Sequence, residues 1–154
     1  MDVLENRIPP VLVAALFGLL MWLNAYLLPG VLALSIELRV GLASAVLVAG
    51  AFICLAGVLS FRDASTTVNP LQPETASALV SSGIYRYTRN PMYLGFAIAL
   101  VAWSILLASP VSALGVLGFV LFMNRFQIRP EERALASLFG TEFEQYCRKV
   151  RRWF

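Results

Sequence analysis

Three stretches of this 154-residue chain contain no charged side chain: Ile8–Ile36 with 29 residues, Val40–Phe61 with 22 and Asn90–Asn124 with 35. A helix needs about 20 apolar residues to cross the hydrocarbon core of a bilayer. The first two stretches are each long enough for one such helix. The sequence therefore predicts an all-α, polytopic integral membrane protein.

The third uncharged stretch is too long for a single crossing and contains Ser109 and Pro110 near its middle. Proline cannot continue a helix, and Ser-Pro favours the start of a turn. We therefore expect a hairpin of two helices, at Met92–Ala108 and Val111–Ile128, which brings the expected total to about four. The second arm is short, so a re-entrant or tilted helix is an open alternative there.

Composition agrees with a membrane protein. The chain is 59% hydrophobic and 14% charged, whereas about a quarter of the residues in a soluble domain are charged. No shift in composition marks a boundary, so one domain over residues 1–154 is expected. The net charge of +3 does not indicate nucleic acid, because the basic residues flank apolar stretches.

The first apolar stretch is not expected to be a cleaved signal peptide. It is longer than the apolar region of such peptides, and the residues before it include Asp2 and Glu5 beside the single Arg7. The chain has no histidine, the commonest metal ligand, and its Cys54 and Cys147 form no CxxC motif. Neither a metal site nor a disulfide is predicted.

The basic residues are distributed unevenly between the two sides of the expected bundle. With four crossings, the amino terminus, the 62–89 segment and the carboxyl tail share one side and carry eleven of the twelve Lys and Arg residues. The other side has only Arg39. Basic residues gather on the cytoplasmic side of membrane proteins. The expected location is the inner membrane of a bacterium, with the 61–91 loop and the carboxyl terminus in the cytoplasm.

The 61–91 loop is one of two segments rich in polar residues. Ala76–Ser82 is predicted to form a short helix that ends at Gly83. Asn90 precedes a proline and should therefore be extended, and Pro91 should occupy the first turn of the next helix.

The second polar segment is the tail, 129–154. Pro130 suits the first turn of a helix, and Glu131 and Glu132 then lie at its positive end. Gly140 should divide this segment into two amphipathic helices, because Thr141 and Glu144 after it form a capping-box pattern. The basic terminus, 148–152, is expected to contact anionic lipid.

Two sequence patterns in these segments resemble a known family. Residues 79–85 and 89–95 read LVSSGIY and RNPMYLG, and residues 128–146 read IRPEERALASLFGTEFEQY. In this order, with a helical hairpin between them, they resemble the isoprenylcysteine carboxyl methyltransferases, which belong to a wider superfamily of phospholipid methyltransferase-like membrane enzymes. The resemblance covers about half of the chain.

The resemblance implies an S-adenosylmethionine-dependent methyltransferase, with S-adenosylhomocysteine as product, that lacks the soluble Rossmann fold. Its cofactor region would be about 61–154. By motif position, Arg89 and Glu132 would be catalytic. The cofactor pocket would be lined by Ser77, Leu79, Val80, Tyr85, Asn90, Pro91, Met92, Tyr93 and Glu131.

This chain departs from the family patterns at two positions. Asn90 replaces a histidine, and Gln127 lies where some prenylcysteine enzymes have an arginine for the substrate carboxylate. Gln127 and Arg125 are therefore the candidate substrate-binding residues. The expected partners are membrane lipids and a lipophilic or lipidated acceptor with a carboxylate or thiol. An amine acceptor must first lose a proton, and no histidine is present to take it.

Two alternatives to a methyltransferase stay open at this point. The chain could be a non-catalytic membrane protein that binds a lipid or a partner, or a relative of the sterol reductases that binds NADPH. Single residues also have simpler interpretations. Glu131 and Glu132 favour a helix amino terminus in any protein, and Tyr85 and Tyr93 are typical of membrane interfaces.

Overall fold

The computed structural model describes residue 5 and residues 7–28, 32–63 and 77–154, and its regular structure there is entirely helical. Proline begins two of the long helices, where its missing N–H costs no hydrogen bond. The elements are α1 (Pro10–Leu27), α2 (Ile36–Asp63), the 3₁₀ turn η2 (Gly83–Arg86), α3 (Pro91–Leu107), α4 (Ala113–Met123), the π-helical turn η3 (Asn124–Ile128) and α5 (Arg129–Lys149).

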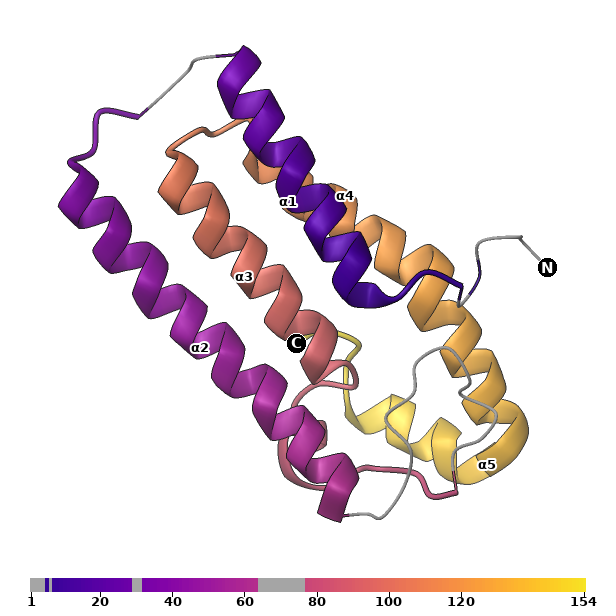
Figure 1. Cartoon of the computed structure of the whole chain (residues 1–154). Coiled ribbons are helices and arrows are strands. Elements are labelled where there is room, and N and C mark those ends of the chain that lie inside the picture. Colours follow the sequence, from indigo (N-terminus) through magenta and orange to yellow (C-terminus); the bar gives the residue numbers. More distant parts are fainter. Residues whose placement is uncertain (1–4, 6, 29–31, 64–76) are drawn as a thin grey trace.

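Helices α1 to α4 lie side by side in alternating directions, and α5 turns across one end of the bundle (Figure 1). The start of α1, the end of α2, the start of α3 and the carboxyl terminus all lie at that end. The opposite end carries Arg39, whose Nε donates a hydrogen bond to the Leu106 carbonyl at 2.9 Å. The basic segments are therefore gathered at one end of the bundle, as the distribution of charge predicts.

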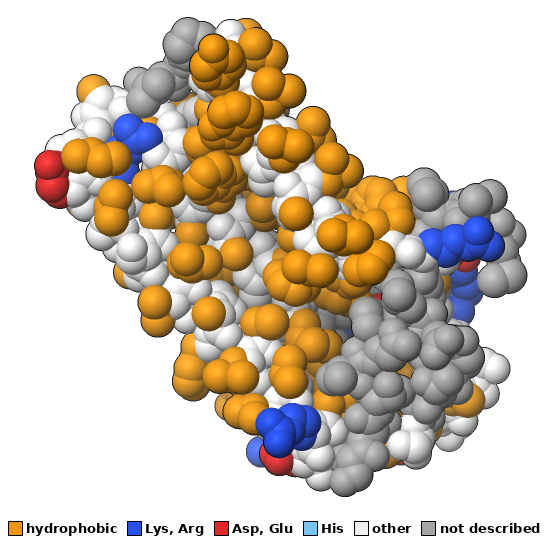
Figure 2. All heavy atoms as spheres, in the orientation of Figure 1, with side chains coloured by type: hydrophobic (Ala, Val, Ile, Leu, Met, Phe, Trp, Pro, Cys, Tyr) orange, Lys and Arg blue, Asp and Glu red, His pale blue; other side chains and the backbone are white. Residues whose placement is uncertain are grey.

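Helices α1 and α2, of 18 and 28 residues, are long and apolar enough to cross a membrane. In each helix, only 17% of the 18-residue apolar stretch is buried inside the protein. Figure 2 shows hydrophobic side chains spread over this face of the bundle. Lipid is the solvent that suits such a surface. Helices α3 and α4 are shorter, with 17 and 11 residues, so four full crossings stay a prediction.

Helices α2 and α3 are held closely together at a pair of glycines. A Cβ atom added to Gly95 would lie 2.7 Å from the Cβ of Cys54 and 2.8 Å from the carbonyl oxygen of Gly50. Both distances are far below van der Waals contact, so only glycine fits at position 95. This contact fixes the first turns of α3, which carry Pro91 and Tyr93, against α2.

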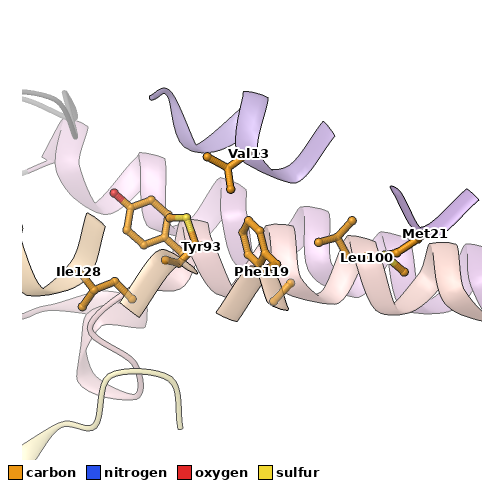
Figure 3. Close-up of a cluster of buried hydrophobic side chains, with 8 residues drawn as sticks. Val13, Met21, Tyr93, Leu100, Phe119 and Ile128 are labelled. Atoms are coloured by element: carbon orange, nitrogen blue, oxygen red, sulfur yellow. The ribbon is translucent and has the colours of Figure 1, made fainter. Parts of the chain in front are cut away.

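Two groups of buried apolar side chains stabilise the fold. The first fills the bundle, and Figure 3 shows its side chains converging from α1, α3, α4 and η3. The ring of Tyr93 belongs to this group. The second lies beneath α5, where Phe143 and Tyr146 of that helix and the following Val150 pack against Val80 and Tyr85. Tyr93 thus belongs to the core of the bundle, and Tyr85 to the group packed against α5.

The structure corrects one predicted element and confirms two others. Residues 77–82 form bends and extended chain, so the helix predicted at Ala76–Ser82 is wrong for the described part of that range, and Ala76 lies outside the described residues. The chain turns instead at Gly83, whose φ of +57° favours glycine. The hairpin turn at residues 108–112 and the break at Gly140, with φ +50° and ψ −122°, are confirmed.

The second arm of the hairpin is shorter than predicted and does not end where expected. It begins at Ala113 rather than Val111 and changes to a π-helical turn at Asn124. The helix then continues without a break into α5. Single π-turns inside helices are frequent at functional sites, and this one leads directly to Glu131 and Glu132.

Candidate functional site

Two adjacent carboxyl groups lie at the start of α5, the helix that turns across one end of the bundle. Glu131 and Glu132 follow Pro130 in the first turn of the helix. Neighbouring residues on an α-helix point about 100° apart. The two side chains consequently meet different surroundings, and they differ in how their charge is compensated.

Glu132 is held by two arginines. Its Oε1 accepts hydrogen bonds from Arg89 Nη2 and Arg152 Nε, each at 2.9 Å, and its Oε2 accepts one from Arg152 Nη2 at 2.5 Å. The Arg152 contact is bidentate, which is the strongest geometry for this pair of groups. The charge of Glu132 is thereby fully compensated within the protein.

Glu131 has a different environment. Its Oε1 accepts a hydrogen bond from the hydroxyl of Tyr93, and no Lys or Arg of the described ranges forms an ion pair with it. Loss of hydration raises the pKa of Glu131 to about 8; the Tyr93 hydrogen bond opposes this rise and the charge of Glu132 adds to it. Glu131 is therefore a carboxyl group that a bound cation would stabilise in its charged form.

The carboxyl tail holds the segment that precedes α3. The Arg151 carbonyl accepts the amide hydrogen of Arg89 at 3.0 Å. The Arg152 carbonyl accepts hydrogen bonds from Asn90 Nδ2 at 3.0 Å and from Thr88 Oγ1 at 3.2 Å. Arg89 also donates through Nη1 to the Cys147 carbonyl at 3.3 Å, while its buried Nε has no hydrogen-bond partner in the described part of the chain.

Tyr85 lies on the other side of the same region. Its ring packs edge-on against Phe61 with centroids 5.3 Å apart, and its carbonyl accepts the hydroxyl hydrogen of Tyr146 at 2.8 Å. Burial raises the pKa of Tyr85, and Tyr146 and Glu131 are near enough to add to the rise. Of these two tyrosines, Tyr93 is the one with a hydrogen bond to Glu131 in the described part of the chain.

The structure distributes the predicted cofactor residues over two neighbouring groups. Tyr93 and Glu131 are in contact, with Asn90 held by the tail and Pro91 and Met92 in the first turn of α3. Val80 and Tyr85 belong to the apolar group beneath α5, Leu79 packs against it, and Ser77 is exposed. Next to the second group lies a groove of about 420 Å³, lined by Leu79, Ser81, Arg86, Glu142, Gln145, Tyr146, Lys149 and Val150.

The structure does not place the two predicted substrate residues together. Gln127 is completely buried, and its Nε2 donates to the Ile8 carbonyl at 2.6 Å. Arg125 is exposed and pairs with Glu5 at 3.3 Å. Its guanidinium carbon lies 5.5 Å from the centre of the Phe126 ring. Gln127 thus faces the interior, whereas Arg125 faces the surface beside the amino-terminal segment.

Sequence reasoning missed the role of Arg152. Lipid contact of residues 148–152 stays a prediction, and the structure shows a further contact within this segment, because the guanidinium of Arg152 is bound to Glu132. Arg148, Lys149 and Arg151 are exposed. No local signal identifies Arg152, since its partner lies 20 residues earlier and beyond the break at Gly140.

Comparison with known proteins identifies the family. The family model described as phospholipid methyltransferase matches residues 38–142. The chain belongs to this family. The match runs from the first turn of α2 to just past the bend at Gly140, so it includes Arg89, Tyr93 and both glutamates. The predicted resemblance to this superfamily is confirmed.

The similar proteins include one described as uncharacterized and several with an assigned activity. A protein from Haemophilus influenzae described as uncharacterized is 47% identical over 62 residues, 40% of this chain and 98% of its own. A probable protein-S-isoprenylcysteine O-methyltransferase of Oryza sativa subsp. indica is 36% identical over 88 residues, 55% of this chain and 44% of its own. Protein-S-isoprenylcysteine O-methyltransferase A of Arabidopsis thaliana is 31% identical over 107 residues, 68% of this chain and 53% of its own. The chain therefore spans about half the length of these two methyltransferases.

Proposed function

We propose that this protein is an S-adenosylmethionine-dependent methyltransferase of the membrane that methylates a carboxylate or thiol of a lipophilic acceptor. The family to which it belongs uses this cofactor. The observation that carries the proposal is the uncompensated carboxyl group of Glu131, held by Tyr93 beside the Arg89–Glu132 ion pair.

The residues of the site fit the functional groups of the cofactor. The carboxyl group of Glu131 suits the ammonium group of the methionine moiety. The buried Nε of Arg89, which lacks a partner in the described part of the chain, suits the carboxylate of that moiety. The faces of Tyr85 and Tyr93 suit a sulfonium cation, which aromatic rings attract through their quadrupole.

When bound, the cofactor supplies a methyl group on a positively charged sulfur. Held by Glu131 and Arg89, it would supply that methyl group to the acceptor, which reacts as a carboxylate or a thiolate and becomes an ester or a thioether. The protein has to hold the two reactants in line and keep water out, and positioning of this kind lowers barriers by several kcal/mol. Arg89 and Glu132 would act by fixing the geometry, because their charges compensate each other.

The acceptor is proposed to reach the site from the bilayer, since α5, which carries the acidic pair in its first turn, turns across the end of the apolar bundle (Figure 1). Gln127 offers no cation to an acceptor carboxylate, and its amide already binds the Ile8 carbonyl. We therefore expect weak or absent turnover of farnesylcysteine analogues. Efficient turnover of such an analogue would contradict the role given to this position.

Ligand binding to the protein purified in detergent tests the cofactor. Calorimetry should show binding of S-adenosylmethionine and S-adenosylhomocysteine, and much weaker binding of NADPH. The acceptor class is then found by transfer of a labelled methyl group to panels of lipophilic acids, thiols and amines. Binding of NADPH without any response to the adenosyl ligands would overturn the proposal in favour of a reductase.

A further inference from the structure

Arg152 connects the start of α5 with the segment before α3. Its guanidinium makes a bidentate contact with Glu132 at the start of α5, with Nε 2.9 Å from Oε1 and Nη2 2.5 Å from Oε2. Its carbonyl accepts hydrogen bonds from Thr88 and Asn90, which precede α3. Through Glu132 it also reaches Arg89, which lies between Thr88 and Asn90 and binds the same carboxylate.

The tail that carries Arg152 is itself held in place. The indole N–H of Trp153 donates to Asn124 Oδ1, in the π-helical turn, at 3.1 Å. Val150 is buried in the apolar group beneath α5. Figure 1 accordingly shows the carboxyl terminus beside the start of α3. Arg152 is therefore presented to Glu132 by a fixed segment of the chain.

We propose that Arg152 is a positioning residue: with Arg89 it neutralises Glu132, so that Glu131 alone is left to receive the cationic end of the ligand. This inference rests on the proposed function, because it concerns the same cofactor site. It adds a residue of the carboxyl tail, beyond both sequence motifs, to the parts that the site requires.

The charges around the acidic pair give the physical reason. Glu132 faces Arg89, Arg152, the thiol of Cys147 and the neighbouring Glu131. Without Arg152, a single arginine would serve two adjacent carboxyl groups. Arg89 could then bind either of them and would compete with a ligand cation for Glu131. Glu131 would also keep its proton to higher pH, because the charge of Glu132, which raises the pKa of Glu131, would be less compensated.

The adjacent arginine provides a matched control. Arg151 is exposed, and its side chain makes no hydrogen bond or ion pair in the described part of the chain. Its carbonyl contact with Arg89 is made by the backbone and is retained in any side-chain variant. Arg152→Gln and Arg151→Gln remove the same charge from neighbouring positions, and only the first removes the contact with Glu132.

Binding of S-adenosylhomocysteine to the purified full chain, measured between about pH 6 and 9, tests the proposal. Arg152→Gln should weaken binding near pH 7 roughly tenfold, the scale of a lost charge-assisted hydrogen bond. It should also move the midpoint of the pH profile upward by about 1 unit. Arg152→Lys keeps the charge but cannot make the bidentate contact, so its affinity for S-adenosylhomocysteine should be intermediate. Arg151→Gln should stay within about twofold of the unchanged protein.

The Glu132→Gln variant, which lacks the charge of Glu132, distinguishes a positioning role of Arg152 from a role in stability alone. If Arg152 acts through Glu132, adding Arg152→Gln to Glu132→Gln should weaken binding no further. Equal binding and equal pH profiles for Arg152→Gln and Arg151→Gln would overturn the inference while leaving the proposed function intact. No binding by the unchanged protein would instead refute the proposed function.

The same double variant decides the matter if Arg152→Gln alone does not fold. Recovery of folding by the double variant, with binding equal to that of Glu132→Gln, would support the inference. If the double variant also fails to fold, Arg152 serves stability through other contacts and the inference is wrong.

Discussion

The hydroxyl of Tyr93, in the first turn of α3, donates a hydrogen bond to the carboxyl group of Glu131, in the first turn of α5. These residues are 38 positions apart and belong to the two separate sequence patterns typical of the family. The contact brings both patterns to one point at the end of the bundle. It leaves Glu131 with a hydrogen-bond donor and, within the described residues, without a cation.

Replacing Glu131 with glutamine is expected to weaken the binding of S-adenosylhomocysteine. The change keeps the shape of the side chain but removes a charge-assisted bond worth about 1.5–3 kcal/mol, so affinity should fall roughly tenfold or more. Calorimetry on the purified variant measures this. Glu132→Gln should have a smaller effect, because it leaves in place the carboxyl group of Glu131, which is the proposed partner of the ligand's ammonium group. Equal and small effects of both changes would show that the glutamates merely favour a helix amino terminus.

The stability of the ligand-free protein should fall as pH rises from about 4.5 to about 8. The pKa of Glu131 is raised from 4.5 to about 8 in the folded chain. In that window the folded state keeps a proton that the unfolded state has lost, so each increase in pH favours unfolding. Thermal unfolding in detergent at several pH values measures the slope. Glu131→Gln should flatten it, and an unchanged slope in this variant would contradict the assignment.

Gly95→Ala should destabilise the protein by about 1–3 kcal/mol, the range for overpacking a tight contact. The added Cβ would collide with Cys54 and with the backbone of Gly50, so α2 and α3 would have to separate. Gly41→Ala on α2 is the control, because nothing lies within 4 Å of its Cβ position. Unfolding in denaturant compares the two. A Gly95→Ala protein as stable as the control would mean that the helices separate at little cost.

Labelling of single cysteines should place the two ends of the bundle on opposite sides of the membrane. In a variant without Cys54 and Cys147, cysteines at the exposed positions Ser81 and Phe154 should react from the cytoplasmic side. One at Ser35 should react only from the other side. Labelling of Ser81 and Phe154 from opposite sides would refute the proposed topology.

Much of the architecture follows from local features of the sequence. The uncharged stretches predict the helices, Ser109 and Pro110 predict the hairpin turn, and the positive φ at Gly140 confirms the predicted break. Pro91 begins α3 as expected. These features depend on residues within a few positions of each other, and the backbone geometry of proline and glycine acts over that range.

The motif residues could also be named from the sequence, but their arrangement could not. Leu79, Val80 and Tyr85 pack under the second half of α5, and Asn90 is bound by the Arg152 carbonyl. The missing helix at residues 77–82 has a similar cause. That segment is shaped by its contacts with α5, and these long-range contacts outweigh local helix propensity.

The amino-acid sequence by itself determined that two glutamates lie side by side at the start of a helix. Only the tertiary structure decided which of them is neutralised. Glu131 and Glu132 have nearly the same neighbours in sequence, and no local rule separates them. The chain bends at Gly140, and its tail returns across the end of the bundle, which delivers Arg152 to Glu132 and leaves Glu131 with Tyr93. Helix periodicity acts over a few residues, whereas the partner of a buried charge depends on the path of the whole chain.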